Sequence, residues 1–376
     1  MDKYKEQLKK AVEQVISDGF QRYEYCEFVK KRKREAKAIC LYGTGNFYNN
    51  YVQNIDKYDY VCDSAPEKWG KYFNGRQCIS PEQLYKLESV VVFVMMGNYQ
   101  DVIEELRKHQ VESYFFGDLF LNVYSEHYDS SWFRKNEQEI MDTIDLLEDD
   151  RSKEIYTNAI CIRIAPQYAD LTFHDMEEKG EYFETGILQF RDKECFVDAG
   201  AFNGDSIKAF MEAVDGNFEK IYGFELDPHN YGMILDDKKI TDDDRICIFQ
   251  KGISSGKMVS GIISNGTGSH MAENGGESVD LINLDSILEN KKVTFIKMDI
   301  EGAEMDGLEG AEHIISEQRP KLAISVYHKL DDLWKIPQYI KQLCPAYKIY
   351  LRHHTAVAWD TDCYAYIDSE KLKDEV

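Results

Sequence analysis

The stretch CFVDAGAFNGDS, residues 195–206, decides the fold of the second half of this chain. It begins as a short apolar run, which predicts a buried strand, and its end is the start of a helix. Gly200 and Gly204 lie between them and have no Cβ, so a ligand can approach the backbone there. The free N–H groups at the helix start favour a bound small molecule. The stretch therefore predicts a strand, a glycine loop and a helix that cradle a ligand.

The charge of this stretch indicates which ligand to expect. Asp198, Asp205 and Ser206 lie beside the glycines, whereas the stretch contains neither Lys nor Arg. The chain also has no G-x-x-x-x-G-K-[ST] phosphate loop. A ligand with cationic groups is therefore expected rather than a polyphosphate. S-adenosylmethionine, which carries an ammonium and a sulfonium group, fits this description.

Composition excludes several classes of partner. The chain has 376 residues, 43% of them hydrophobic, and a formal net charge of -23, which argues against binding to nucleic acid. Its longest apolar run, residues 90–96, is far shorter than the roughly 20 residues of a membrane span. Nine cysteines occur without a C-x-x-C pair, as is typical of a reducing compartment. We therefore expect a cytoplasmic protein without a membrane span.

The first 120 residues predict a helical segment followed by a small α/β domain. Residues 2–37 are expected to be helical, with Leu8, Val12 and Val15 on one face and Gly19 as a stop. Alternating strand and helix patterns follow over residues 37–120, which indicates a small parallel, Rossmann-like sheet. Strands are expected at residues 38–42, 58–62, 90–95 and 113–116.

The first turn of this smaller domain resembles a dinucleotide fingerprint only in part. Gly43 and Gly45 are present, and Asp63 follows the second strand where a ribose-binding acid would lie. Tyr48, however, occupies the position of the third glycine. The turn either binds a nucleotide or nucleotide-sugar, or belongs to a module for packing or for homo-oligomerisation, and the second interpretation is favoured.

Residues 121–194 predict a helical, aromatic-rich connection, and residues 195–376 predict a second, larger α/β domain. Tyr182 and Phe183 lie just before the glycine loop and are candidates for an acceptor pocket, although aromatic residues more often form core. A polar, glycine-rich stretch at residues 264–270 is either a lid or a surface hairpin.

Polar residues follow the ends of five expected strands of the larger domain. Because the carboxyl ends of parallel strands share one edge of the sheet, these residues should line a ligand site. Glu225 is placed where a carboxylate holds the two hydroxyls of a ribose. The five residues are Asp198, Glu225, Asp299, His328 and His353.

These residues belong to motifs that resemble the FkbM family of S-adenosylmethionine-dependent methyltransferases. The matching pieces are FVDAG with GDS, GFE, MDIEGAE and SVYH, within residues 180–367, and Leu226 departs from the family where proline is frequent. The resemblance implies a class I methyltransferase sheet of seven strands with the last antiparallel. It also implies O-methylation of a hydroxyl on a sugar, glycan or polyketide-type small molecule.

The expected site consists of cofactor-binding, catalytic and acceptor-binding residues, and no metal ligand is assigned. Its cofactor-binding residues are Asp198, Gly200, Phe202, Gly204, Asp205, Ser206, Glu225, Leu226 and Asp299. Its catalytic residues are His328 as general base or orienting group, Asp299, Glu301, and His353 as the rival base. Its acceptor-binding residues are Tyr182, Phe183, Tyr327 and His328.

Two other functions compete with methyl transfer. One is an NAD-dependent nucleotide-sugar oxidoreductase or epimerase that uses the Gly43 turn, although no Y-x-x-x-K pair follows that turn. The other is a non-catalytic scaffold that retains the fold, which the intact set of polar residues at strand ends disfavours.

Overall fold

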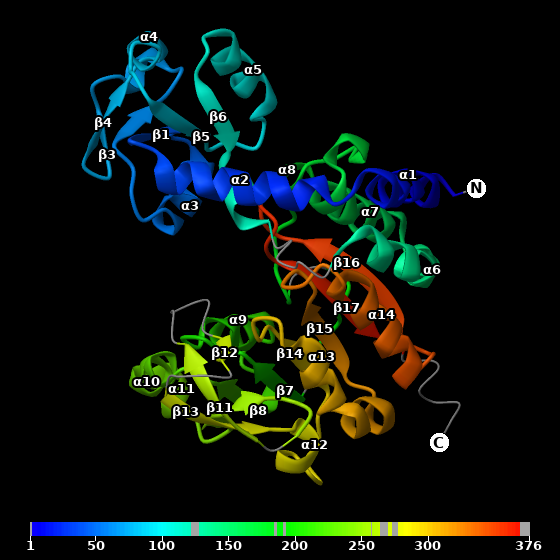
Figure 1. Cartoon of the computed structure of the whole chain (residues 1–376). Helices are drawn as coiled ribbons and strands as arrows, with labels where there is room; N and C mark the ends of the chain where they lie inside the picture. Colours follow the sequence, from blue (N-terminus) through cyan, green and yellow to red (C-terminus); the bar gives the residue numbers. More distant parts are fainter. Residues whose placement is uncertain are drawn as a thin grey trace.

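The computed structural model describes residues 2–121, 128–183, 186–190, 193–256, 258–263, 270–272 and 277–368. Two α/β units lie one above the other, and a group of helices lies beside them (Figure 1). Most of the glycine-rich stretch that was expected to form a lid or hairpin, residues 264–269, lies outside the described residues.

The larger unit is built on a seven-stranded sheet in the order β16-β17-β15-β14-β7-β8-β9. β17 is antiparallel to both neighbours, and the other pairs are parallel. This is the class I methyltransferase arrangement, so the predicted fold class is confirmed. The strands are β7 (Glu194–Ala199), β8 (Phe218–Glu225), β9 (Ile246–Gln250), β14 (Phe295–Met298), β15 (Lys321–Ser325), β16 (Lys348–His353) and β17 (Thr361–Tyr366).

Short helices and a small second sheet surround these strands. The helices are α9 (Asp205–Ala213), α10 (Pro228–Asp236), α11 (Lys238–Thr241), α12 (Leu284–Ile287), α13 (Glu304–Glu309) and α14 (Asp332–Leu343), with a π-helix at Ile314–Gln318. The second sheet has the order β10-β13-β11-β12. Its strands are β10 (Gly252–Ile253), β11 (Met258–Ile263), β12 (His270–Ala272) and β13 (Glu277–Ile282).

The smaller unit has a six-stranded sheet in the order β3-β4-β2-β1-β5-β6, parallel except for the β3–β4 hairpin. The prediction found four of these strands and missed β3 and β4, which are short and partly exposed. The strands are β1 (Ala38–Tyr42), β2 (Tyr60–Cys62), β3 (Tyr72–Phe73), β4 (Arg76–Ile79), β5 (Val90–Val94) and β6 (Glu112–Phe115). The helices are α2 (Gln21–Glu35), α3 (Asn46–Tyr51), α4 (Pro81–Leu84) and α5 (Gln100–Lys108), with 3-10 turns η1 (Val52–Asn54), η2 (Pro66–Lys68) and η3 (Phe116–Phe120).

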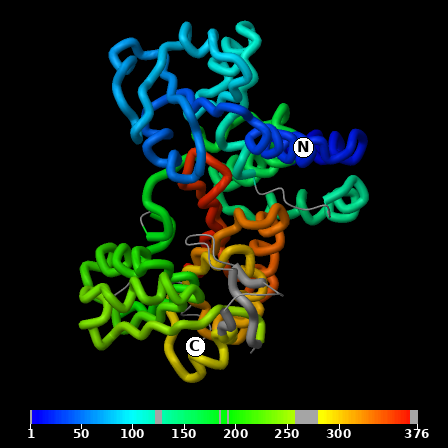
Figure 2. The backbone as a smooth tube through the Cα atoms, turned by 60° about the vertical axis from the view of Figure 1, so that its left-hand side comes forward, coloured from blue at the N-terminus to red at the C-terminus, as the bar shows by residue number. Residues whose placement is uncertain are grey.

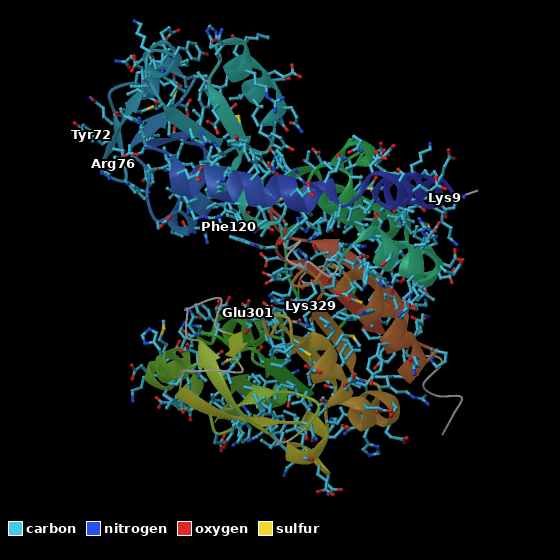
Figure 3. All side chains as sticks on the ribbon, viewed as in Figure 1. Lys9, Tyr72, Arg76, Phe120, Glu301 and Lys329 are labelled. Atoms are coloured by element: carbon cyan, nitrogen blue, oxygen red, sulfur yellow. The ribbon has the colours of Figure 1, made fainter. Side chains whose placement is uncertain are left out.

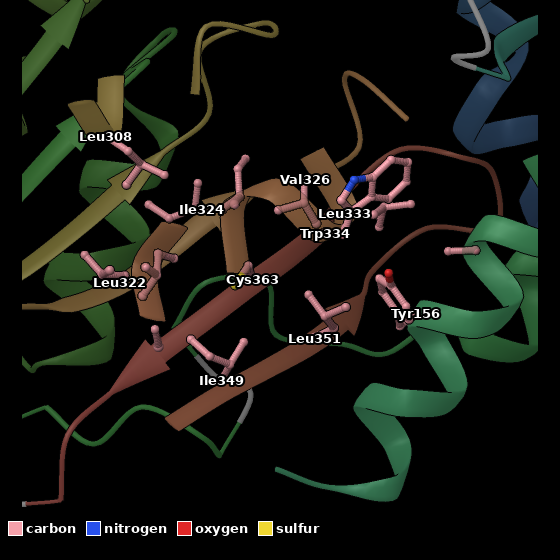
Figure 4. Packing of buried hydrophobic residues seen from close by; sticks show 14 of the residues in the cluster. Tyr156, Leu308, Leu322, Ile324, Val326, Leu333, Trp334, Ile349, Leu351 and Cys363 are labelled. Atoms are coloured by element: carbon pink, nitrogen blue, oxygen red, sulfur yellow. The ribbon is translucent and has the colours of Figure 1, made fainter. Parts of the chain in front are cut away.

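Helix α1 (Lys3–Asp18) ends before Gly19, as predicted, and it packs on the helices that follow the smaller unit in the chain. Its buried face, which includes Leu8 and Val12, joins the hydrophobic core of the larger unit together with α6 (Ser130–Leu146) and α7 (Asp150–Ile164). α7 in turn packs on the edge strand β16, where Tyr156 lies near Leu351 (Figure 4). α1 therefore shares its core with the larger unit, and the predicted domain boundaries at residues 120 and 194 stay a prediction. η4 (Pro166–Tyr168) and α8 (Phe173–Met176) complete the helical group.

The loop between β16 and β17 joins the two units. It rises from the larger unit toward the smaller one, as the red end of the chain shows in Figure 2. Ala356 and Val357 are buried in the core of the smaller unit, and Ala356 N–H donates to Tyr51 Oη at 3.1 Å. The Trp359 ring lies 5.0 Å from that of Phe120 and 6.0 Å from that of Tyr51. Among the described helices, none has the length and apolar character that a membrane crossing requires.

Candidate active site

A cavity of about 850 Å³ lies at the carboxyl edge of the seven-stranded sheet. Its size is within the range of roughly 300–1,000 Å³ that is typical of small-molecule sites. In Figure 3, Glu301 and Lys329 lie on the side of the larger unit that faces the smaller one. Most of the predicted site residues line this cavity. They are Tyr182, Phe183, Gly200, Phe202, Asp205, Ser206, Glu225, Leu226, Asp299, Glu301, Tyr327 and His328.

Three predicted residues do not line it: Asp198, Gly204 and His353. His353 ends β16 at the expected edge, but its side chain is fully buried beside Phe173, at 4.9 Å between ring centroids. Its Nδ1 lies 2.8 Å from Thr361 Oγ1. Burial, together with the charge of Arg163, holds the pKa of His353 well below its usual value. The prediction of His353 as a rival base is wrong in geometry, because strand position does not fix which way a side chain points.

The glycine loop is shaped by the neighbouring strand. Gly200 has φ +84°, and a Cβ there would lie 1.8 Å from the carbonyl oxygen of Asp299, which follows β14. Gly204 has φ +81° and immediately precedes α9, where a Cβ would lie 2.4 Å from Ile240 Cδ1. Both positions therefore require glycine. The close approach brings Asp299 next to the loop, so the two sequence motifs form one site.

Glu225, at the tip of β8, is positioned by backbone groups. Its carboxylate accepts from Phe202 N–H at 2.8 Å and from Asp227 N–H at 2.7 Å. Burial raises the pKa of Glu225 to about 7, although these hydrogen bonds favour the charged form. Because each carboxylate oxygen can accept more than one hydrogen bond, Glu225 can still accept bonds from a ligand in the cavity.

Lys297 is a buried cation that the sequence analysis did not assign. It pairs in register with Asp198 across β14 and β7, and its Nζ lies 3.2 Å from Asp198 Oδ1 and donates to Gly200 O at 2.7 Å. Asp198 also accepts from Ser206 Oγ at 2.5 Å. Burial opposes the charge on Lys297, but Asp198 and Asp299 outweigh it and raise the pKa of the lysine. Asp198 does not line the cavity itself, but it contacts Lys297 and Ser206, which do.

Carboxylates surround His328 on both ring nitrogens. Its Nε2 lies 3.4 Å from Glu301 Oε2 and 3.6 Å from Asp299 Oδ1, and its Nδ1 lies 3.0 Å from Glu304 Oε1. Burial opposes the imidazolium, but Glu304, and after it Glu301 and Asp299, raise the pKa of His328 well above its usual value. Glu304, the last residue of the MDIEGAE motif, also accepts from Ile300 N–H at 2.8 Å, so it holds both the loop and the imidazole.

Two tyrosines hold the Asp299 carboxylate. Tyr182 Oη donates to Asp299 Oδ2 at 3.1 Å, and Tyr327 Oη donates to Oδ1 at 3.4 Å. Burial raises the pKa of both phenols well above the usual value, so they remain donors. Glu181 and Asp360 add further acid to the cavity wall, and burial raises the pKa of each.

Four residues that line the cavity hold the left-handed backbone conformation without being glycine. They are Tyr182 (φ 58°), Phe202 (φ 46°), Glu301 (φ 57°) and Asp360 (φ 53°). Such conformations cost about 1–3 kcal/mol each and concentrate at functional sites. The surrounding structure therefore holds the backbone of these four residues in conformations that are unfavourable by themselves.

The same group of residues offers ligands that suit a metal ion. Asp299, Glu304 and His328 each present one ligand atom, and these atoms lie within 4.8 Å of one another. An imidazolium on His328 provides a positive charge among the same carboxylates without an ion.

The corresponding residues of the smaller unit do not form an open site. Asp63 accepts from Thr44 N–H at 2.8 Å, from Thr44 Oγ1 at 2.7 Å and from Lys68 Nζ at 2.8 Å. Its carboxylate is therefore occupied by the turn after β1 and by the loop after β2. Tyr48, in the place of the third glycine, is buried and its Oη lies 3.2 Å from Tyr58 Oη. This geometry does not favour the NAD-dependent alternative.

Residues 198–350 match the family model described as the methyltransferase FkbM domain. We call the larger unit, which contains these residues, the FkbM domain. The family resemblance of the MDIEGAE and SVYH motifs is thus confirmed. No curated protein matches the sequence.

The FkbM domain and the smaller unit share their fold with a crystal structure of methyltransferase FkbM from Methylobacillus flagellatus KT. The TM-score is 0.67 at 24% identity, and the match covers 97% of this chain and 99% of that chain. Two other structures match only part of the chain, at a TM-score of 0.32 each. Aeropyrum pernix fibrillarin with bound S-adenosyl-L-methionine is 11% identical over 48% of this chain and 70% of its own. An rRNA methylase from Streptococcus thermophilus is 16% identical over 47% and 89%.

Proposed function

We propose that this protein is an S-adenosylmethionine-dependent O-methyltransferase that acts on a hydroxyl of a sugar, a glycan or a polyketide-type small molecule. One observation carries the proposal. The glycine loop, the Glu225 carboxylate and the group formed by Asp299 and His328 all line one cavity at the carboxyl edge of a class I methyltransferase sheet.

The cofactor fits the residues of this edge. The backbone around Gly200 and Ser206 would hold the methionine part, and Glu225 would accept hydrogen bonds from the ribose. Leu226 supplies an apolar wall beside Glu225. The acidic lining, which includes Asp205 and Asp299, suits a ligand that carries ammonium and sulfonium charges.

S-adenosylmethionine supplies an electrophilic methyl group on a sulfonium, which is a good leaving group. The protein mainly has to position the acceptor oxygen, and such positioning can contribute roughly 7–11 kcal/mol to lowering the barrier. The acceptor hydroxyl must also lose its proton. Because its pKa is raised, His328 is an imidazolium at neutral pH, where Glu304 holds it on Nδ1, its Nε2–H orients the hydroxyl and the carboxylate of Asp299 or Glu301 takes the proton. At a pH above this raised pKa, the neutral imidazole takes the proton on Nε2. The phenols that bind Asp299 keep its carboxylate in place.

The proposal also includes a cytoplasmic location. All nine cysteines are free, and eight of them are buried. This is the pattern of small apolar residues in a reducing compartment.

Ligand binding tests the function directly. S-adenosylhomocysteine is expected to raise the thermal midpoint of the purified protein by mass action, whereas NAD and nucleotide-sugars should leave it unchanged. Release of S-adenosylhomocysteine from S-adenosylmethionine in the presence of a hydroxyl acceptor then tests the reaction. Stabilisation by NAD alone would contradict the proposal.

A further inference from the structure

The smaller unit forms part of the same cavity. Asn50 and Tyr51 at the end of α3, and Gln53 and Asn54 in η1, line it together with the FkbM domain. Trp359, in the loop between β16 and β17, lines it as well. We call these five residues the outer wall. The cavity therefore extends from the carboxyl edge of the seven-stranded sheet to a surface formed by the smaller unit and by the loop between β16 and β17.

The outer wall is uncharged and rich in hydrogen-bonding groups. Asn50, Gln53 and Asn54 are exposed, and their carboxamides carry N–H donors and acceptor oxygens, although Gln53 Nε2 already donates to Asn50 O. Trp359 adds an aromatic ring that is half-exposed. Carboxamides beside an aromatic face match a ring that has hydroxyls along its edge and C–H groups on its face, which is the chemistry of a saccharide.

The inner part of the cavity restricts the charge of such a ligand. Its lining includes six carboxyl groups, from Glu181, Asp205, Glu225, Asp299, Glu301 and Asp360. The cations of the lining are already paired, Lys251 with Asp280 at 3.0 Å, Lys297 with Asp198 at 3.2 Å and the His328 imidazolium with Glu304 at 3.0 Å. Among the described lining residues, a carboxylate or phosphate on the acceptor would therefore meet no unpaired cation to neutralise it. The cavity therefore suits a neutral or amine-bearing saccharide.

The outer wall is fixed in place before any ligand binds. Tyr51 holds the loop between β16 and β17 through Ala356 N–H, and Thr355 Oγ1 donates to Trp359 O at 2.8 Å. Ala356 and Val357 are part of the core of the smaller unit. Because the loop belongs to the FkbM domain and its tip belongs to the other core, the two sides of the cavity keep a defined separation.

We infer that the smaller unit is the acceptor-recognition domain and that its outer wall binds a neutral or amine-bearing saccharide whose hydroxyl is methylated. The inference rests on the proposed function and extends it, because it assigns the smaller unit to substrate binding rather than to packing or dimerisation alone.

The test uses the full chain and a panel of defined acceptors. The panel contains methyl glycosides of galactose, mannose and fucose, methyl glucosaminide, methyl glucuronide, glucose 6-phosphate and a macrolactone without sugar. Release of S-adenosylhomocysteine is measured for each with saturating S-adenosylmethionine. A variant with Asn50→Ala, Gln53→Ala and Asn54→Ala is compared with Gln77→Ala, which removes an exposed carboxamide of the same unit outside the cavity.

Turnover should occur with neutral or amino glycosides and not with the glucuronide, the phosphate or the macrolactone. The triple variant should lower kcat/KM for that glycoside at least about tenfold, because neutral hydrogen bonds to the acceptor are lost. Its affinity for S-adenosylhomocysteine, measured by calorimetry, should match that of the wild type and of Gln77→Ala. The three residues are exposed, so the variant is expected to fold.

The inference and the proposed function fail in different ways. If the wild type does not bind S-adenosylhomocysteine, the proposed function is wrong. If it binds but methylates only the macrolactone or an anionic sugar, or none of the panel, the saccharide inference is overturned while the cofactor assignment stands. Unchanged kcat/KM in the triple variant would overturn the role of the outer wall.

Discussion

The two α/β units of this protein have similar topology and place an acid at the same point, yet only one unit keeps that acid available. Asp63 and Glu225 each follow or end the second strand of a parallel sheet. Asp63 is bound by Thr44 and Lys68, whereas Glu225 is held by backbone N–H groups and lines the cavity. A carboxylate at a strand tip therefore indicates a ligand site only where no lysine or arginine side chain of the protein already pairs with it.

The turn glycines of the two units are also similar, although only one turn lines the cavity. A Cβ on Gly43 would lie 2.9 Å from the carbonyl oxygen of Met95, and a Cβ on Gly200 would lie 1.8 Å from that of Asp299. In both units the glycine lets the chain pass the neighbouring strand. Such a glycine marks the point where the chain leaves one strand and passes close to the next. It does not by itself show whether the domain binds a ligand or only packs against its neighbour.

The largest expected effect concerns histidines that face carboxylates in the two units. His328→Asn should lower kcat by about 10²- to 10⁴-fold with S-adenosylhomocysteine affinity unchanged, because the group proposed to orient the acceptor hydroxyl or take its proton is lost. His109 lies 3.3 Å from Glu105 on the surface of the smaller unit, and His109→Asn should leave kcat unchanged. Steady-state kinetics measure both. Near-normal kcat in His328→Asn would remove the catalytic role of that residue.

Lysine–carboxylate pairs allow a second comparison. Lys297→Met leaves the buried Asp198 without its cation and should destabilise the protein by about 3–5 kcal/mol. The pair of Lys68 and Asp63 is more exposed, so Lys68→Met should cost at most about 1 kcal/mol. Urea unfolding without ligand measures both changes. Equal losses would show that the two pairs are energetically alike.

The strand-tip acids themselves provide the third test. Glu225→Ala should weaken S-adenosylhomocysteine binding by about 1.5–3 kcal/mol, since a charged acceptor of the ribose is removed. Asp63→Ala should not change that affinity. Isothermal titration distinguishes them, and the reverse result would place the cofactor in the smaller unit.

The smallest effect is a pH dependence. Burial raises the pKa of Glu225 to about 7, so lowering the pH from 8 to 6 protonates its carboxyl group. If the ionised form binds the ribose, the Kd for S-adenosylhomocysteine should rise about tenfold at pH 6. Glu225→Gln, which does not titrate, should flatten this dependence. A pH dependence that persists in Glu225→Gln would assign it to another group.

Much of the candidate site could be predicted from local sequence. Buried strands appear as apolar runs, and the polar residues after them are placed at one edge by the parallel topology, which correctly brought Glu225, Asp299 and His328 together. His353 shows the limit, because the same argument fixed its position along the strand but not its direction. Lys297 was visible as a charge inside an apolar strand, although only the register with Asp198 explains it.

The sequence by itself determined the fold class, the FkbM motifs and the acids at the carboxyl edge of the sheet, because each depends on residues close together in the chain. Only the tertiary structure decided that α1 joins the larger core, that Asp63 is closed by Lys68 and that Asn50 and Trp359 lie on one cavity. These are contacts between segments far apart in sequence. They depend on how separately formed elements pack, and no local pattern of apolar and polar residues encodes that packing.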